Sequence, residues 1–232
     1  MESKVLIALD FDGVLCNSAD ECLHNIELIQ NIKLGSKQRE LFLSFRYLVN
    51  EPFEYFILFD YIINKEEICE ERFSKDVNLQ SPISSSRMNK KFFANRNKLI
   101  NSIGMDEWCK INKPTPFFNC LKDLTNNSTF DFIIVSTKNE DSLRLWLSYY
   151  NFSVNGIYGM ESYRKYKSKF EIISKISNSY NKVLFVDDNK IHLEKYNWDS
   201  INCETVLAGW GYNSLDYDNC KDTVSYIKDL NS

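Results

Sequence analysis

The sequence predicts an α/β protein whose core is a parallel β-sheet with helices on both faces, and whose chain carries an inserted all-helical domain. Strand-like runs that alternate with helical segments predict the sheet, because this alternation is typical of parallel sheets covered by helices. A gap of roughly a hundred residues after the first run predicts the insertion, since crossover connections are much shorter. Four apolar runs bounded by polar or turn residues are the predicted buried strands: Val5–Leu9, Phe132–Val135, Val183–Val186 and Thr205–Leu207.

The second half of the chain supplies the remaining elements of the core. Gly156–Tyr158 is a weaker candidate for a fifth strand, and apolar residues at helical spacing predict helices at Ser142–Tyr150 and Ser168–Ile176. The chain is expected to re-enter the core in an extended conformation at 113–116, because two prolines there disfavour a helical conformation in the residues before them. A helix is predicted directly afterwards, at Phe117–Leu124.

The long gap carries apolar residues at helical spacing, which predicts a separate helical domain. Gly35, Pro52 and the segment Ser81–Ser86 interrupt this pattern, and the last of them is expected to be a flexible loop. The aromatic residues of Phe53–Tyr61 are expected to form the core of this domain and not a platform for substrate. Its predicted helices are Ala19–Ile32, Lys37–Asn50, Phe53–Asn64, Glu66–Val77 and Met88–Ile103.

Composition and charge disfavour several classes of function. The chain has 232 residues, a net charge of −4 and a pI near 5.4, so it has no long-range attraction for a polyanion or a membrane surface. Its seven cysteines form no C-x-x-C pair, which argues against structural zinc and indicates reduced thiols. The first apolar run is too short for a signal peptide, and Glu54 and Asp60 interrupt the most apolar stretch, Phe53–Ile63. We expect a cytoplasmic location, with no nucleic-acid or membrane partner.

The strongest chemical signal is the sequence Asp10-Phe11-Asp12-Gly13 at the end of the first predicted strand. Residues two apart in a strand point the same way, so Asp10 and Asp12 are both expected to face the carboxyl edge of the sheet. Open α/β sheets bind ligands at that edge, and Gly13 allows the backbone to turn sharply beside it. Two carboxylates held close together require a cation, a shared proton or both.

Further polar residues belong at the same edge. The acidic pair Asp187-Asp188 follows the third apolar run, and the two acidic pairs together form an oxygen-only set that suits Mg²⁺. Ser136 and Thr137 end the second run and offer a hydroxyl group there. Lys167 and Lys169 stand at the start of a predicted helix, from which a lysine can reach a phosphoryl oxygen.

In this order and spacing, these four elements resemble the haloacid dehalogenase superfamily of phosphohydrolases, in particular its phosphoglycolate-phosphatase-like branch. The resemblance covers about Lys4–Leu15 and Lys113–Tyr212, including the segment Ala208-Gly209-Trp210-Gly211-Tyr212 after the last strand. It implies a Rossmann-like catalytic core at 1–16 and 112–232. It also implies that 17–111 is a cap domain that closes over the site and sets substrate choice.

The resemblance implies a role for each residue. Asp10 is expected to be the nucleophile that takes the phosphoryl group, and Asp12 the acid/base that protonates the leaving oxygen and then activates water. Ser136, with Thr137 as the alternative, is expected to orient the phosphoryl group, and Lys169, with Lys167 as the alternative, matches the lysine of the family. The expected catalytic residues are Asp10, Asp12, Ser136 and Lys169; the expected substrate-binding residues are Gly13, Thr137, Lys138 and Lys167; the expected Mg²⁺ ligands are Asp10, Asp12, Asp187 and Asp188, with either member of the last pair as the one in contact with the metal.

These expectations describe a magnesium-dependent phosphatase that acts on a small phosphorylated metabolite, as a monomer or a homodimer. Asp12 favours phosphate transfer over carbon–halogen cleavage, because the dehalogenases of the superfamily lack an acid at that position. Two alternatives stay open. One is a phosphomutase, which returns the phosphoryl group to substrate, and the other is a non-catalytic protein that binds a phosphorylated ligand.

Overall fold

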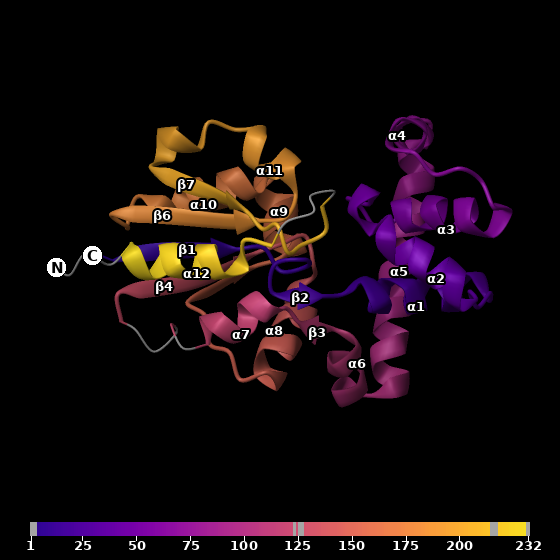
Figure 1. The fold of residues 1–232 in the computed structure, drawn as a ribbon, viewed down its shortest axis with the longest axis horizontal. Coiled ribbons are helices and arrows are strands. Elements are labelled where there is room, and N and C mark those ends of the chain that lie inside the picture. The colour runs from indigo at the N-terminus through magenta and orange to yellow at the C-terminus, as the bar shows by residue number, and fades with distance from the viewer. Residues whose placement is uncertain (1–3, 123, 125–127, 214–217, 231–232) are drawn as a thin grey trace. The chain divides into compact units, whose positions relative to one another are not determined.

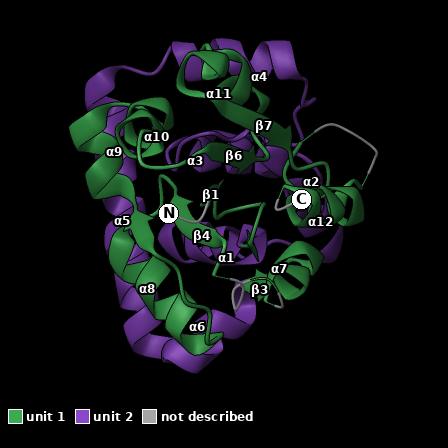
Figure 2. Ribbon diagram, turned by 90° about the vertical axis from the view of Figure 1, so that its left-hand side faces the viewer, with its two compact units in different colours: residues 1–17, 113–232 green, residues 18–112 purple. Residues whose placement is uncertain are grey.

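The computed structural model describes residues 4–122, 124, 128–213 and 218–230. The chain forms two compact units, one made of Met1–Asn17 with Lys113–Ser232 and the other of Ser18–Asn112 (Figure 2). The expected insertion, 17–111, starts and ends one residue earlier than the second unit. We call the first the core unit and the second the helical unit, and describe each by itself.

The core unit is built on a five-stranded sheet in the order β5-β4-β1-β6-β7. Figure 1 labels four of these strands, β1, β4, β6 and β7. All neighbouring strands of the sheet pair in parallel, and in the central strand Leu9 lies opposite Ile134 on one side and Val186 on the other. β1, β4 and β6 are buried almost throughout, as expected for parallel strands covered on both faces. The strands are β1 (Val5–Leu9), β4 (Phe130–Val135), β5 (Gly156–Tyr158), β6 (Lys182–Asp187) and β7 (Cys203–Leu207).

Helices cover both faces of this sheet, which confirms the predicted fold class (Figure 1). On one face Ile172 and Ile173 of α10 (Lys169–Ser177) and Trp198 join a buried cluster with side chains of the strands. On the other face Phe132 packs edge to face against Phe152 and Phe118 packs against it at a tilt, at ring-centroid distances of 6.4 and 4.9 Å. The helices of the core unit are α7 (Pro116–Leu121), α8 (Glu140–Tyr149), α9 (Met160–Tyr166), α10 (Lys169–Ser177), α11 (Lys190–Glu194), η2 (Trp198–Ile201) and α12 (Cys220–Asp229).

A short antiparallel pair marks the place where the chain leaves the core unit and returns to it. β2 (Cys16–Asn17) pairs with β3 (Lys113–Pro114), so the chain is extended where the two prolines predict it. Thr115 then donates a hydrogen bond from Oγ1 to Val14 O at 2.7 Å and accepts one from Phe118 N at 3.3 Å. The second bond caps α7, which starts with a proline, a residue favoured in the first turn of a helix.

Aromatic side chains form much of the core of the helical unit. Tyr55 stacks between Phe42 and Phe92, with ring centroids 5.8 and 5.5 Å away. Phe53, Tyr55, Phe56, Phe59 and Tyr61 are all buried in one cluster, in agreement with the expectation that this run forms a core. The helices of this unit are α1 (Ala19–Gln30), α2 (Ser36–Ser44), η1 (Arg46–Leu48), α3 (Glu54–Asn64), α4 (Glu70–Asn78), α5 (Pro82–Ile103) and α6 (Met105–Ile111).

The expectation of a flexible loop at Ser81–Ser86 is wrong, because α5 already begins at Pro82. Ser81 is its N-cap and accepts a hydrogen bond at Oγ from Ser84 N at 3.2 Å. A run of serines lacks the apolar periodicity by which a helix is recognised, but a serine followed by proline is a favourable helix start. In the part of the chain that the structure describes, no helix combines the length and the apolar character needed to cross a membrane.

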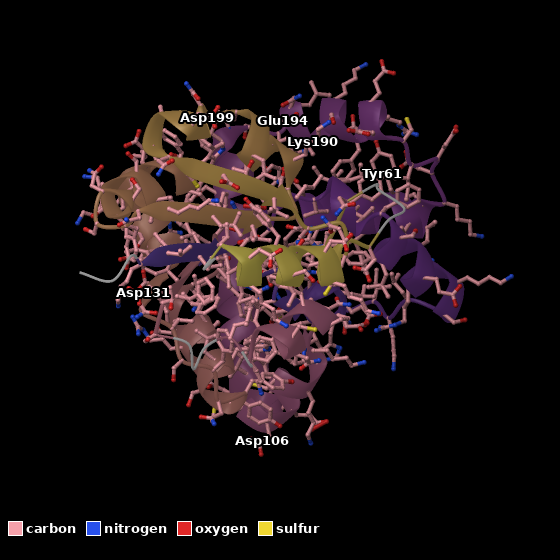
Figure 3. The ribbon with its side chains drawn as sticks, turned by 60° about the vertical axis from the view of Figure 1, so that its left-hand side comes forward. Tyr61, Asp106, Asp131, Lys190, Glu194 and Asp199 are labelled. Atoms are coloured by element: carbon pink, nitrogen blue, oxygen red, sulfur yellow. The ribbon has the colours of Figure 1, made fainter. Side chains whose placement is uncertain are left out.

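An acidic residue also lies at the opposite, amino edge of the sheet. Asp131, labelled in Figure 3, is the second residue of β4. It accepts hydrogen bonds from Lys4 Nζ at 3.1 Å, Asn155 Nδ2 at 3.0 Å and Tyr180 OH at 2.9 Å. These contacts tie the start of β4 to neighbouring segments of the core unit, so Asp131 has a structural role away from the carboxyl edge.

Candidate active site

The carboxyl ends of three adjacent strands bring the predicted polar residues together. Asp10 directly follows β1, Ser136 directly follows β4, and Asp187 is the last residue of β6. The backbone continues the sheet for one more residue, since Asp10 N donates to Val186 O at 2.9 Å and Ser136 N donates to Tyr158 O at 2.9 Å. The side chains are therefore held on a rigid edge.

A buried lysine bridges two of the carboxylates. Lys169 is the first residue of α10, and its Nζ lies 2.8 Å from Asp10 Oδ1 and 2.7 Å from Asp187 Oδ2. Ser168, the N-cap, accepts a hydrogen bond at Oγ from Glu171 N at 3.1 Å and so fixes the start of the helix. Lys167, the alternative lysine, is exposed and has a left-handed backbone conformation with φ of 73°. The structure thus places Lys169, and not Lys167, between the aspartates.

The lysine neutralises the two carboxylates unequally. Burial raises the pKa of Asp10 above its ordinary value, and the charge of Asp187 adds to the increase, while Lys169 opposes it. Burial also acts to raise the pKa of Asp187, but Lys169 and His192 outweigh it and hold that pKa at about 2. Asp187 is therefore the ionised partner of Lys169.

Asp188 is held in a narrow space between two glycines. A Cβ atom added at Gly13 would lie 2.0 Å from Asp188 Oδ2, and one added at Gly211 would lie 2.3 Å from Asp188 Cβ. Gly13 also has a positive φ of 88°, which other residues rarely adopt. Tyr212 N donates a hydrogen bond to Asp188 Oδ2 at 2.6 Å. These contacts fix the direction of the Asp188 carboxylate.

The donor set at this edge fits a divalent cation. Asp10, Asp187 and Asp188 are buried, and each offers a carboxylate oxygen within 4.8 Å of the others. Lys169 contacts Asp10 and Asp187, and Asp188 adds a third carboxylate beside them, so the group has negative charge that a cation would balance. An oxygen-only set of this kind suits Mg²⁺. The carboxylate of Asp12, also expected to be a ligand, is not part of this group.

Asp12 instead pairs with a second lysine. Lys138 Nζ donates to Asp12 Oδ1 at 2.9 Å, and the lysine side chain is fully buried while that of Asp12 is 23% exposed. Lys138 was expected to contact substrate, and the structure places its ammonium group against the predicted acid/base residue. The two predicted catalytic aspartates therefore contact different lysines, Asp10 contacting Lys169 and Asp12 contacting Lys138.

The two candidate hydroxyl groups differ in their surroundings. Ser136 is buried, and its Oγ accepts a hydrogen bond from Lys138 N at 3.3 Å. Thr137 is exposed. Ser136 is thus the hydroxyl that the backbone fixes at the edge of the sheet.

His192 is a site residue that the sequence did not identify. Its Nδ1 lies 3.0 Å from Asp187 Oδ2, the same oxygen that contacts Lys169. The other Asp187 oxygen, Oδ1, accepts a hydrogen bond from Asn189 N at 2.8 Å. The available signal was its position five residues after Asp187, close enough along the chain for a histidine to turn back toward the strand end.

Residues 208–212, which follow β7, lie beside Asp188. Trp210 Nε1 donates to Val14 O at 3.0 Å, and its ring packs on Phe117 with a centroid distance of 4.4 Å. Tyr212 OH donates to Asn17 Oδ1 at 2.8 Å. These bonds join residues 210–212 to the turn that follows β1 and to β2, so Gly211 and Gly13 both approach Asp188.

Solved structures with the same fold include several hydrolases. A predicted phosphoglycolate phosphatase from Haemophilus somnus 129PT is 17% identical to this chain and has a TM-score of 0.57. The match covers 100% of this chain and 99% of the phosphatase chain. A predicted phosphatase from Clostridium acetobutylicum is 13% identical, with 99% and 100% covered and a TM-score of 0.59. A subfamily IA hydrolase of the haloacid dehalogenase superfamily from Geobacter sulfurreducens is 12% identical, with 89% and 87% covered and a TM-score of 0.51.

No protein-family model matches the chain, and no curated protein matches its sequence. At identities of 12 to 17%, the similar structures show the fold, and they show it over nearly the whole chain. The resemblance in the sequence motifs and the architecture of the molecule therefore agree.

Proposed function

We propose that this chain, which has the fold of haloacid dehalogenase superfamily hydrolases, is a magnesium-dependent phosphatase that hydrolyses a small phosphomonoester through an aspartyl phosphate on Asp10. The observation that carries the proposal is the contact of Lys169 Nζ with both Asp10 and Asp187, beside Asp188, at the carboxyl edge of a parallel sheet. This edge is where open α/β sheets bind ligands.

The first half of the reaction forms the aspartyl phosphate. An oxygen of Asp10 attacks phosphorus, and the bond between phosphorus and the leaving oxygen breaks. Asp12, two residues further along the chain, gives its proton to that leaving oxygen. Proton transfer of this kind is typically worth about 10²–10⁴-fold in rate.

The second half returns Asp10 to its starting state. Asp12, now a carboxylate, takes a proton from a water molecule whose oxygen attacks phosphorus. The bond between phosphorus and Asp10 breaks, and inorganic phosphate leaves. A covalent intermediate replaces one difficult displacement with two easier ones.

The charges around Asp10 support this chemistry. A carboxylate that approaches an anionic phosphate ester meets repulsion, and Lys169 supplies a positive charge 2.8 Å from Asp10 Oδ1. Asp10, Asp187 and Asp188 would hold Mg²⁺, which supplies further charge neutralisation when bound. Ser136, buried and fixed at the adjacent strand end, would orient the phosphoryl group through its hydroxyl.

The remaining parts of the proposal concern the setting of this site. The substrate is a small phosphorylated metabolite, the helical unit is the cap domain, and the protein works in the cytoplasm as a monomer or homodimer. The net charge of −4 supports a small ligand over a polyanion such as nucleic acid.

The test is phosphate release from a panel of phosphomonoesters, with Mg²⁺ or with a chelator. Mg²⁺-dependent release from at least one member, lost in Asp10→Asn, is the expected result. A native protein that isomerises a sugar phosphate without releasing phosphate would be a mutase. A protein that binds phosphorylated ligands tightly but turns none over would be a binding protein.

A further inference from the structure

Lys138 lies where its ammonium group can act on the predicted acid/base residue. The residue belongs to the loop between β4 and α8, and its side chain reaches Asp12 in the turn after β1. Its Nζ lies 2.9 Å from Asp12 Oδ1 and 5.3 Å from the centre of the Phe11 ring. Phe11 is itself buried and meets Trp146 edge to face at 4.9 Å. The ammonium is thus confined between a rigid aromatic face and a carboxylate.

The backbone of Lys138 is fixed as firmly as its side chain. Its N–H donates to Ser136 Oγ at 3.3 Å, and its carbonyl oxygen accepts from Met160 N at 2.8 Å. A Cβ atom added at Gly159 would lie 2.7 Å from that carbonyl oxygen, so the chain segments are in close contact. The backbone of Lys138 is thus fixed beside the end of β4, and its ammonium group is fixed at Asp12, beside the end of β1.

We propose that Lys138 is a positioning residue that holds the carboxylate of Asp12 in the orientation needed to transfer protons. With Oδ1 held by Lys138, rotation of the Asp12 carboxylate is restricted, and the group is directed before substrate arrives. The inference rests on the proposed function, because it assigns a role within the same reaction. Each catalytic aspartate then has a different lysine in contact with it: Lys169 supplies positive charge beside Asp10, and Lys138 orients Asp12.

Burial argues against a lysine that waits in solvent for a substrate anion. The side chain of Lys138 is 0% exposed, whereas that of Asp12 is 23% exposed and accessible to a reacting group. A buried ammonium needs a nearby carboxylate, because leaving it without one carries a large desolvation cost. The accessible member of the pair is the carboxylate, so the contact with the reacting oxygen belongs to Asp12.

A leaving group that needs no proton separates the two half-reactions. p-Nitrophenolate leaves phosphorus without help from an acid, so its release reports the attack of Asp10. Hydrolysis of the aspartyl phosphate still needs Asp12 to take a proton from water. A misdirected Asp12 will therefore slow the second half-reaction and leave the first one intact.

The experiment measures p-nitrophenyl phosphate turnover with Mg²⁺ before and during the steady state. The native chain, Lys138→Met, Asp12→Asn and the double variant form a cycle, and Lys228→Met on α12 controls for the loss of an exposed lysine. Lys138→Gln, which keeps a hydrogen-bond donor, is measured in parallel in case the methionine variant does not fold. Circular dichroism checks the fold of each variant.

For Lys138→Met we expect a burst of about one nitrophenolate per active site, followed by a steady state in which kcat and KM fall together by up to about 10²-fold, so that kcat/KM stays at the native value. The double variant should be no slower than Asp12→Asn, because Lys138 acts through Asp12. Lys228→Met should behave like the native chain.

Two results would overturn the inference alone. One is a raised KM in Lys138→Met with native kcat and burst, which would make Lys138 a substrate-binding group. The other is an equal loss of rate from Lys138→Met in the native and Asp12→Asn backgrounds. If the native chain hydrolyses nothing in the panel of phosphomonoesters, the proposed function is itself overturned, and this inference with it.

Discussion

The ammonium nitrogen of Lys169 lies 2.8 Å from Oδ1 of Asp10. Both side chains are buried, the aspartate directly after β1 and the lysine at the first position of α10. The same nitrogen contacts Asp187. Burial acts to raise the pKa of Asp187, but Lys169 and His192 hold that pKa at about 2. One ammonium thus joins the ends of β1 and β6.

Replacing this lysine will separate catalysis from metal binding. In Lys169→Met we expect kcat to fall by more than about 10²-fold, since a positive charge beside the transferred phosphoryl group is lost. Without metal, the free energy of unfolding should fall by about 3–5 kcal/mol, because buried carboxylates lose their partner. Kinetics and urea denaturation measure the two effects.

The matched comparison is Lys167→Met, two residues away on an exposed surface. Its effects on kcat and on stability should be much smaller than those of Lys169→Met. Calorimetric titration of Lys169→Met should still detect Mg²⁺ binding, because the three carboxylates remain. Equal losses of kcat in both variants would contradict the assignment of Lys169.

A methyl group at Gly211 will disturb the metal site. The added Cβ would lie 2.3 Å from Asp188 Cβ, so the carboxylate must shift from its place between the two glycines. We expect Gly211→Ala to weaken Mg²⁺ binding by about 10–100-fold, the usual effect of displacing the support of a metal ligand. Isothermal titration calorimetry measures the affinity.

Gly35→Ala is the control, because a Cβ there would meet only Gln38 Oε1 at 3.7 Å, an ordinary contact distance. It lies in the helical unit and should leave Mg²⁺ affinity unchanged. Native affinity in Gly211→Ala would show that Asp188 does not hold the ion.

Stability will depend on pH through Glu54 at the start of α3. Burial raises the pKa of Glu54 from 4.5 to about 7. The folded state therefore binds the carboxyl proton of Glu54 more tightly than the unfolded chain does. The contribution of this proton to the free energy of unfolding is fully present below pH 4.5 and is lost as the pH rises toward about 7. Gln at this position cannot ionise, so Glu54→Gln should be more stable than the native chain at pH 8, by on the order of 3 kcal/mol.

Urea denaturation at pH 4.5 and pH 8 measures the free energy of unfolding of the native chain and of Glu54→Gln. We expect the two values to differ less at pH 4.5 than at pH 8. Glu70→Gln, an exposed position at the start of α4, is the control and should leave this difference in stability unchanged. If Glu54→Gln lost stability between the two pH values as steeply as the native chain does, the ionisation of Glu54 would not be the cause.

Much of the core unit could be predicted because its signals are local. Buried parallel strands appear as continuous apolar runs, and the acidic residues that end them mark the functional edge. The short helices α9 and α11 were not predicted, since helices of one or two turns carry too little apolar periodicity to be recognised. The start of α5, a much longer helix, was missed because its run of serines carries no apolar periodicity.

The site was harder to complete because its contacts join residues far apart in the chain. Sequence alone left Lys167 and Lys169 as alternatives. In the structure Lys167 is the exposed C-cap of α9, whereas Lys169 is the buried first residue of α10. The contact of Lys138 with Asp12 spans two strand ends, and no spacing in the sequence reports it. The contact of His192 with Asp187 depends on the path of the loop before α11.

The most direct test of the central claim is to trap the phosphoryl group on Asp10. The chain is mixed with ³²P-labelled p-nitrophenyl phosphate and Mg²⁺, quenched in acid within the first turnover, and digested so that the labelled peptide can be identified by mass spectrometry. We predict acid-stable label on the peptide that contains Asp10, more of it in Asp12→Asn, and none in Asp10→Asn. Phosphate release by the native chain without label on that peptide, or label retained in Asp10→Asn, would contradict the account.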